Sequence, residues 1–196
     1  MEQLRQEDVR KLHAEINQIN NQRFLLTTLA VTMFGVVSAW LVPRSSQSAG
    51  PDDGMAYLEA GLLFVLLFLL YVASHTLRNV MRTDTTYLEV FELSEWEAHS
   101  TKYRAGANYF AYTKIQSAFF IALGILNAMI TVLTHIASVC SPYAIGSAVL
   151  FLAYIVLIWG MGWRKWWDRE GAARSRWQRI RDADGQSSNT VSGSAA

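Results

Sequence analysis

The sequence predicts an all-α membrane protein with four transmembrane helices and a small helical cytoplasmic head. Hydrophobic residues make up 52% of the 196 positions and charged residues 17%, but residues 115–163 contain no charged residue at all. A hydrocarbon layer of about 30 Å needs about 20 helical residues, and four apolar segments reach that length. Because lipid offers backbone amides no hydrogen-bonding partner, helix is the expected state of such runs.

Residues 1–23 are predicted to form a cytoplasmic amphipathic helix. Its apolar residues are spaced three, four and three positions apart, which is an a/d seam of two heptads. So short a helix is marginal alone and needs a partner surface, either the chain's own middle segment or another subunit. The seam residues, which are candidates for a partner or oligomer interface, are Val9, Leu12, Ile16 and Ile19.

Residues 24–74 are predicted to form the first transmembrane hairpin, with spans at about 24–42 and 55–74. The first apolar run is too long for a signal peptide, and the segment before it carries four acidic side chains. We therefore expect this run to stay in the membrane.

Residues 75–114 are predicted to form a cytoplasmic helical stalk and loop. The stalk is expected to end near Arg82, and a second helix is expected from about 86 to 100, because Thr86 with Glu89 fits a capping box. Phe91 and Trp96 lie among the apolar residues of this second helix. They are the residues we expect to receive the front helix or another interface partner.

Residues 115–163 are predicted to form the second transmembrane hairpin, with spans at 115–135 and about 143–162. Asn127 is the polar residue nearest to a span centre, and Tyr154 lies at a similar depth as its candidate partner. The amide either joins two helices or lines a pore in an oligomer. Small residues at helical spacing, such as Gly124 and Ala128, let helices approach closely and favour a homo-oligomer.

Residues 164–184 are predicted to form a basic, tryptophan-rich interfacial segment, and residues 185–196 a disordered tail. Basic and aromatic side chains next to a span are attracted to the anionic inner leaflet of a bilayer. Nucleic acid is a less favoured partner, because basic residues are expected beside a span in any case. The predicted membrane-interface anchors are Trp163, Trp166, Trp167, Arg176 and Arg179.

The distribution of basic residues predicts the orientation of the chain. Residues 1–23, 75–114 and 164–196 together hold sixteen Lys and Arg residues, whereas the segments 43–54 and 136–142 hold one, Arg44. Cytoplasmic segments carry the excess of basic residues. We therefore expect a multi-pass protein of the plasma, or bacterial inner, membrane with both termini in the cytoplasm.

The sequence predicts no catalytic residue, no cofactor and no metal site. It contains no nucleophile elbow, Walker loop or HExxH motif. Glu92, Glu95 and His99 share a helical spacing that can hold a metal, but a solvated Glu–His pair is the favoured interpretation.

These features favour a non-enzymatic, oligomeric membrane component whose cytoplasmic helices dock a soluble protein or sense an intracellular event. The alternative is a pore-forming or channel subunit that permeabilises the membrane. In layout alone, the chain resembles small multi-span proteins that act as membrane sensors or effectors in bacterial antiviral operons. That resemblance rests on architecture and on no specific residue.

Overall fold

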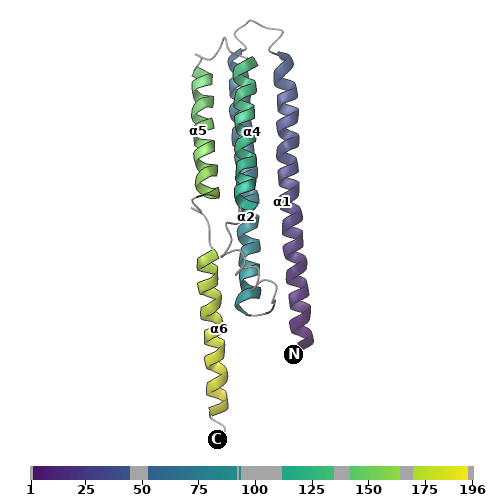
Figure 1. Cartoon of the computed structure of the whole chain (residues 1–196), viewed down its shortest axis with the longest axis vertical. Coiled ribbons are helices and arrows are strands. Elements are labelled where there is room, and N and C mark those ends of the chain that lie inside the picture. Colours follow the sequence, from purple (N-terminus) through teal and green to yellow (C-terminus); the bar gives the residue numbers. More distant parts are fainter. Residues whose placement is uncertain are drawn as a thin grey trace. The chain divides into compact units, whose positions relative to one another are not determined.

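The computed structural model describes residues 2–44, 53–91, 93, 112–134, 142–163 and 170–193. Within these residues the chain is entirely helical, with no strand (Figure 1). Four helices are long and apolar enough to cross a membrane, which confirms the all-α prediction and the four predicted apolar helices. The helices are α1 (Glu2–Arg44), α2 (Asp53–Val90), α4 (Tyr112–Thr134), α5 (Pro142–Gly162) and α6 (Glu170–Gly193).

The chain divides into two compact units. The span unit comprises Arg23–His75 and Phe110–Trp166, and the head unit comprises Met1–Gln22, Thr76–Tyr109 and Trp167–Ala196. α1 and α2 contribute residues to both units, because each continues without a break from an apolar segment into a polar one.

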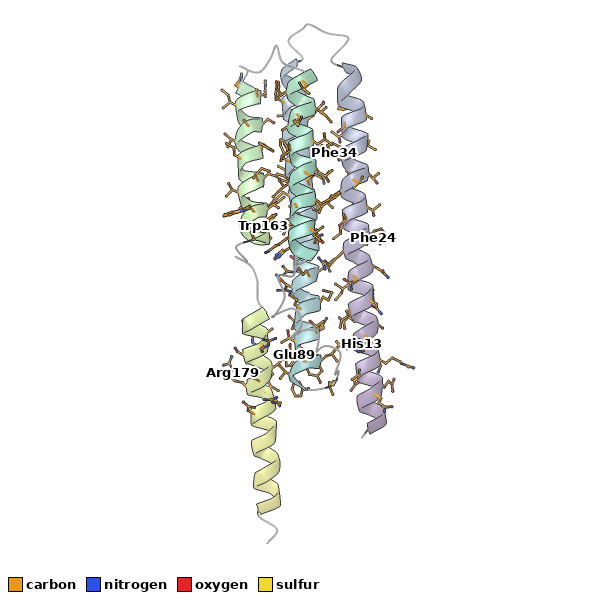
Figure 2. All side chains as sticks on the ribbon, in the orientation of Figure 1. His13, Phe24, Phe34, Glu89, Trp163 and Arg179 are labelled. Atoms are coloured by element: carbon orange, nitrogen blue, oxygen red, sulfur yellow. The ribbon has the colours of Figure 1, made fainter. Side chains whose placement is uncertain are left out.

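The span unit is held together by one apolar core to which all four of its helices contribute. Phe64 packs its ring 5.7 Å from that of Tyr154, and Tyr71 lies 5.4 Å from Phe120 in an edge-on arrangement. Figure 2 shows side chains filling the space between these helices. The buried apolar residues of this core are Ala30, Leu63, Phe64, Leu67, Leu70, Tyr71, Phe120, Leu123, Tyr154, Ile158 and Met161.

The outward faces of the span unit are also apolar. Phe24 is 67% exposed and Leu133 71% exposed in the single chain. A helix that is apolar on its outer face is suited to lipid or to another apolar helix rather than to water. The span unit is therefore built as a multi-pass membrane protein is.

The prediction that the stalk ends near Arg82 and that a new helix begins at Thr86 is wrong. α2 is unbroken from Asp53 to Val90. The hydroxyl of Thr83 donates to the carbonyl of Asn79, and that of Thr86 donates to the carbonyl of Arg82. These threonines thus bond back to the preceding turn, which is compatible with a helix interior, instead of capping a new one. The rest of the predicted second helix, 94–100, lies outside the described residues.

At the other end of the chain, α6 begins at Glu170 and continues through Gly193. The sequence instead predicts disorder from Gly185. Once a helix has nucleated, each further residue adds one backbone hydrogen bond, and no proline follows Pro142 to stop it. Side chains beyond Ala183 lie outside the described residues.

Two glycines of the span unit provide a matched test of its packing. A side chain at Gly124 would overlap the ring of Tyr154, whereas Gly35 has open space around it. We expect Gly124→Ala to destabilise the span unit by roughly 1–3 kcal/mol, because a packed core does not accept added volume. Gly35→Ala should leave stability equal or slightly higher. Thermal unfolding of both variants in detergent measures this, and equal melting temperatures would contradict the packing described here.

Candidate functional site

A layer of polar side chains is buried inside the span unit, where α1, α2 and α4 meet. Arg23 donates from Nη2 to Oε1 of Gln116 at 2.8 Å, and Gln116 in turn donates from Nε2 to the hydroxyl of Ser74 at 2.5 Å. Arg23 and Gln116 are 3% and 6% exposed, and Ser74 is fully buried. One amide side chain therefore joins three helices.

A second hydrogen bond lies in the same layer. The hydroxyl groups of Tyr71 and Ser117 are 2.8 Å apart, and the ring of His75 lies 6.0 Å from that of Tyr71. Gly162 of α5 completes the layer, since a side chain at this position would overlap Ser117. Tyr71, His75 and Ser117 are all buried, so the whole layer is closed to water.

The spacing along α2 explains how the layer forms. Tyr71, Ser74 and His75 are three and four residues apart, and helical side chains at this spacing share one face. Gln116 and Ser117 reach that face from the first turns of α4. Ionisable and polar side chains buried in a membrane span are costly and usually mark function. We refer to Arg23, Tyr71, Ser74, His75, Gln116 and Ser117 as the polar layer.

Deeper in the span unit, Asn127 and Tyr154 each bond to the backbone of a neighbouring helix. Asn127 donates from Nδ2 to the carbonyl of Ala60 at 3.2 Å. The hydroxyl of Tyr154 donates to the carbonyl of Phe120. The expectation that these two side chains pair with each other is therefore wrong. Asn127 is fully buried in the single chain, so its amide joins α4 to α2.

The head unit contains a second polar site, where α6 packs on the end of α2. One nitrogen of Arg174, Nη2, donates to both carboxylate oxygens of Glu89, at 3.1 and 2.8 Å. Nη1 of Arg181 donates to the carbonyl of Val90, the last residue of α2, at 3.1 Å. Carbonyls at a helix C-terminus lack helical partners and carry partial negative charge, so an arginine there is stabilising.

Aromatic rings complete this contact. The ring of Trp177 lies edge-on to Tyr87 at 5.0 Å and to Phe91 at 6.3 Å. Tyr87 and Phe91 also pack on each other at 4.7 Å. Such ring pairs contribute about 0.5–1.5 kcal/mol each, and a partly exposed ion pair contributes up to about 1 kcal/mol. The attachment of α6 to α2 is therefore specific in geometry but modest in strength.

A carboxylate with one buried, unpartnered oxygen lies elsewhere in the head unit. Oδ2 of Asp84 is buried and has no hydrogen bond within the described part of the chain. Burial, together with the negative charge of Glu15, raises the pKa of Asp84 from 3.8 to about 6. Near pH 6 this group therefore exchanges a proton that an exposed aspartate would already have lost.

The predicted interface residues fall in the head unit. The seam residues Val9, Leu12, Ile16 and Ile19 are the only ones between positions 6 and 22 that are not exposed, so this face is partly covered within the chain. Phe91 lies in the contact with α6. Trp96 lies outside the described residues.

The structure describes three of the five predicted membrane anchors. Trp163 is half-buried at the end of α5, whereas Trp166 and Trp167 lie outside the described residues. Arg176 and Arg179 are exposed on α6. Figure 2 labels Arg179 on this helix. The neighbouring side chains Arg174, Trp177 and Arg181 instead contact α2, so part of this basic, tryptophan-rich segment binds protein.

The described residues contain no group of three or more His, Cys, Asp or Glu side chains placed to hold a metal ion. Glu92, Glu95 and His99 lie outside these residues. Sequence reasoning missed the polar layer as a unit. Its one local signal is the recurrence of Tyr71, Ser74 and His75 on one face at the end of an apolar span.

Comparison of the chain with protein-family models, with curated proteins and with solved structures finds no match.

Gln116→Met tests the polar layer, because methionine keeps the volume but removes both hydrogen bonds. Arg23 and Ser74 each lose a buried bond, and we expect a loss of roughly 1–3 kcal/mol in the free energy of unfolding. Ile115→Met is the control, since Ile115 is 52% exposed on the next position of α4. Thermal unfolding in lipid nanodiscs measures both, and unchanged stability of Gln116→Met would contradict the network.

Asp84 gives the head unit a pH-dependent stability. Its folded-state pKa of about 6 lies above the ordinary value of 3.8, so the folded chain binds this proton more tightly. The protonated carboxyl of Asp84 makes its full favourable contribution to the free energy of unfolding below about pH 4. This contribution is lost as pH rises through 6. We expect Asp84→Asn to stabilise the head unit at pH 7.5 and to flatten the pH profile between 4 and 7. Hydrogen exchange of α2 amides across this range measures the effect, and an unchanged profile would contradict it.

Proposed function

We propose that the chain is a non-enzymatic membrane component whose head unit lies in the cytoplasm, where it docks a soluble protein or senses an intracellular event. The orientation is supported by the sixteen basic residues in the segments predicted to be cytoplasmic, against one in the outer loops. With short outer loops, the head unit is the part of the chain large enough to recognise a protein.

The observation that carries the proposal is the continuity of α1 and α2. Each is a single helix that contributes to the span unit and to the head unit. A partner that binds the polar half of either helix therefore acts on a helix that also belongs to the span unit. This is the construction that a sensor or a membrane adaptor needs.

The polar layer gives the span unit a part that can respond. Arg23 lies on α1, and Ser74 and His75 lie on α2, so both continuous helices contribute to it. A buried polar network favours one arrangement of the helices and makes others costly, because breaking a pair leaves further buried polar groups unsatisfied. Such a layer holds a resting state until a signal displaces one of the helices.

The exposed apolar faces of the span unit are consistent with lipid contact and with a homo-oligomer. The exposed Arg176 and Arg179 are available for the anionic inner leaflet or for an acidic partner. The layout is also that of small multi-span sensors and effectors in bacterial antiviral operons, and we include that role in the proposal. Within the described residues, Asn127 is buried between helices of the single chain, which favours an interhelical contact over a pore-lining role for this amide.

Co-purification tests the proposal. The tagged full-length chain, isolated from its native host in mild detergent, should retain a soluble protein in a fixed molar ratio. We expect charge reversal at Arg176 and Arg179, or arginine at the exposed Asn17 and Asn20, to remove that protein. Leu152→Ala is the control, because Leu152 is 62% exposed on the span unit.

Isolation of the intact chain without any stoichiometric soluble protein would contradict partner docking. Protease access to tags on the two termini of intact cells checks the orientation independently. Digestion of either tag from outside the cell would place the head unit on the wrong side for the proposed role.

A further inference from the structure

The end of α2 carries an unusual combination of groups in the head unit. Within its last turn and the residue after it lie the carboxylate of Glu89, the carbonyl of Val90 and the rings of Tyr87 and Phe91. Negative charge and two aromatic rings thus occupy one small surface. We call these four residues the α2-end surface.

This surface is electrostatically incomplete on its own helix. The last turn of α2 contains no basic residue. A helix C-terminus has the charge of about half an electron, and Glu89 adds a full negative charge beside it. α6 supplies two positive groups here, since Arg174 binds Glu89 and Arg181 binds the carbonyl of Val90.

The residues of α6 that contact the α2-end surface follow a simple spacing. Arg174, Trp177 and Arg181 are three and four residues apart, so they form one stripe along the helix. Trp177 places its ring edge-on to Tyr87 and Phe91 between the two arginine contacts. The pattern Arg-x-x-Trp-x-x-x-Arg therefore describes what the α2-end surface recognises.

The contact between α6 and the α2-end surface is also partly exposed to solvent. The side chain of Arg174 is 36% exposed and that of Glu89 24%, so water and salt reach this ion pair. Partly exposed pairs are screened by salt and contribute little to stability. The neighbouring Ile180 remains 42% exposed. One stripe of side chains therefore holds α6 on the α2-end surface. The ion pair in this stripe is accessible to solvent.

We propose that the α2-end surface is a docking site for a basic helix that carries an aromatic residue, and that α6 is its resident, displaceable occupant. The incoming partner is a helix with the Arg-x-x-Trp-x-x-x-Arg chemistry of α6. This inference rests on the proposed function and deepens it, because it assigns the site at which the soluble partner binds. Binding of that partner displaces α6 from the surface. Partner binding and a rearrangement of the head unit are therefore coupled.

A fluorescent peptide of residues 170–184 provides the probe, and the full-length chain in lipid nanodiscs provides the receptor. In the wild-type chain α6 occupies the surface, so the peptide should bind weakly. Trp177→Ala with Arg181→Ala vacates the surface, and we expect the peptide to bind this variant at least ten-fold more tightly. Ser175→Ala with Gln178→Ala is the matched control, because both residues are exposed on the same helix.

Charge exchange tests whether the peptide uses the same surface. Adding Glu89→Arg to the vacated chain should abolish binding of the wild-type peptide. A peptide carrying Arg174→Glu should then restore it. Absence of binding to the vacated chain, binding that survives Glu89→Arg, or failure of the exchanged pair would each overturn the proposal.

A second measurement covers the case in which the vacated chain does not fold. Hydrogen exchange of α6 in the wild-type chain should accelerate several-fold between 50 and 500 mM salt, and Glu89→Gln should accelerate it at low salt. α6 protection that is independent of both salt and Glu89 would overturn the proposal.

The outcome also separates this inference from the proposed function. If the peptide binds but no soluble protein is recovered from the native host, the proposed soluble partner is contradicted and the docking surface is supported. If a soluble protein is recovered and Glu89→Arg does not affect its binding, the proposed partner is supported and its docking on the α2-end surface is contradicted.

Discussion

The structure depends on one constraint, which is that polar groups within an apolar span must find partners inside the protein. The backbone meets it by forming helices, and the side chains meet it by pairing across helices. Gln116 shows this most clearly, since its amide accepts from Arg23 of α1 and donates to Ser74 of α2. The amide nitrogen of Asn127 and the hydroxyl of Tyr154 meet the same constraint by donating to backbone carbonyls of neighbouring helices. The positions of the four spans relative to one another within this unit are therefore specified by a few polar contacts laid over a general apolar core.

The head unit meets a related constraint at a helix end. α2 ends at Val90, where the negative end of the helix dipole lies beside an acidic residue and the last turn contains no basic residue. α6 supplies two arginines and a tryptophan from the other end of the chain. Because the contact is partly exposed, it positions α6 without locking it. A surface that is completed by a weakly held segment is well suited to regulation, since a competitor needs to offer only the same three groups.

Several sequence-based expectations were accurate because the relevant information is local. Hydropathy identifies an apolar helix from its own residues, so the four long apolar helices were predictable. The break predicted near Thr86 was wrong because a threonine hydroxyl that can cap a helix can also donate to a carbonyl of the preceding turn inside a helix. The pattern Thr-x-x-Glu does not distinguish these two cases. Glu89 found its partner in Arg174, not in the backbone of a new helix.

The sequence by itself determined the helical class, the four apolar helices and the charge asymmetry of the connecting segments, because composition and spacing along one segment suffice for each. The tertiary structure alone decided which side chains meet. Arg23 and Gln116 are separated by 93 positions, Ser74 and Gln116 by 42, and Glu89 and Arg174 by 85. No local pattern encodes such pairs, because each forms only when packing brings separate helices into contact. Both candidate sites of this protein are made of such pairs.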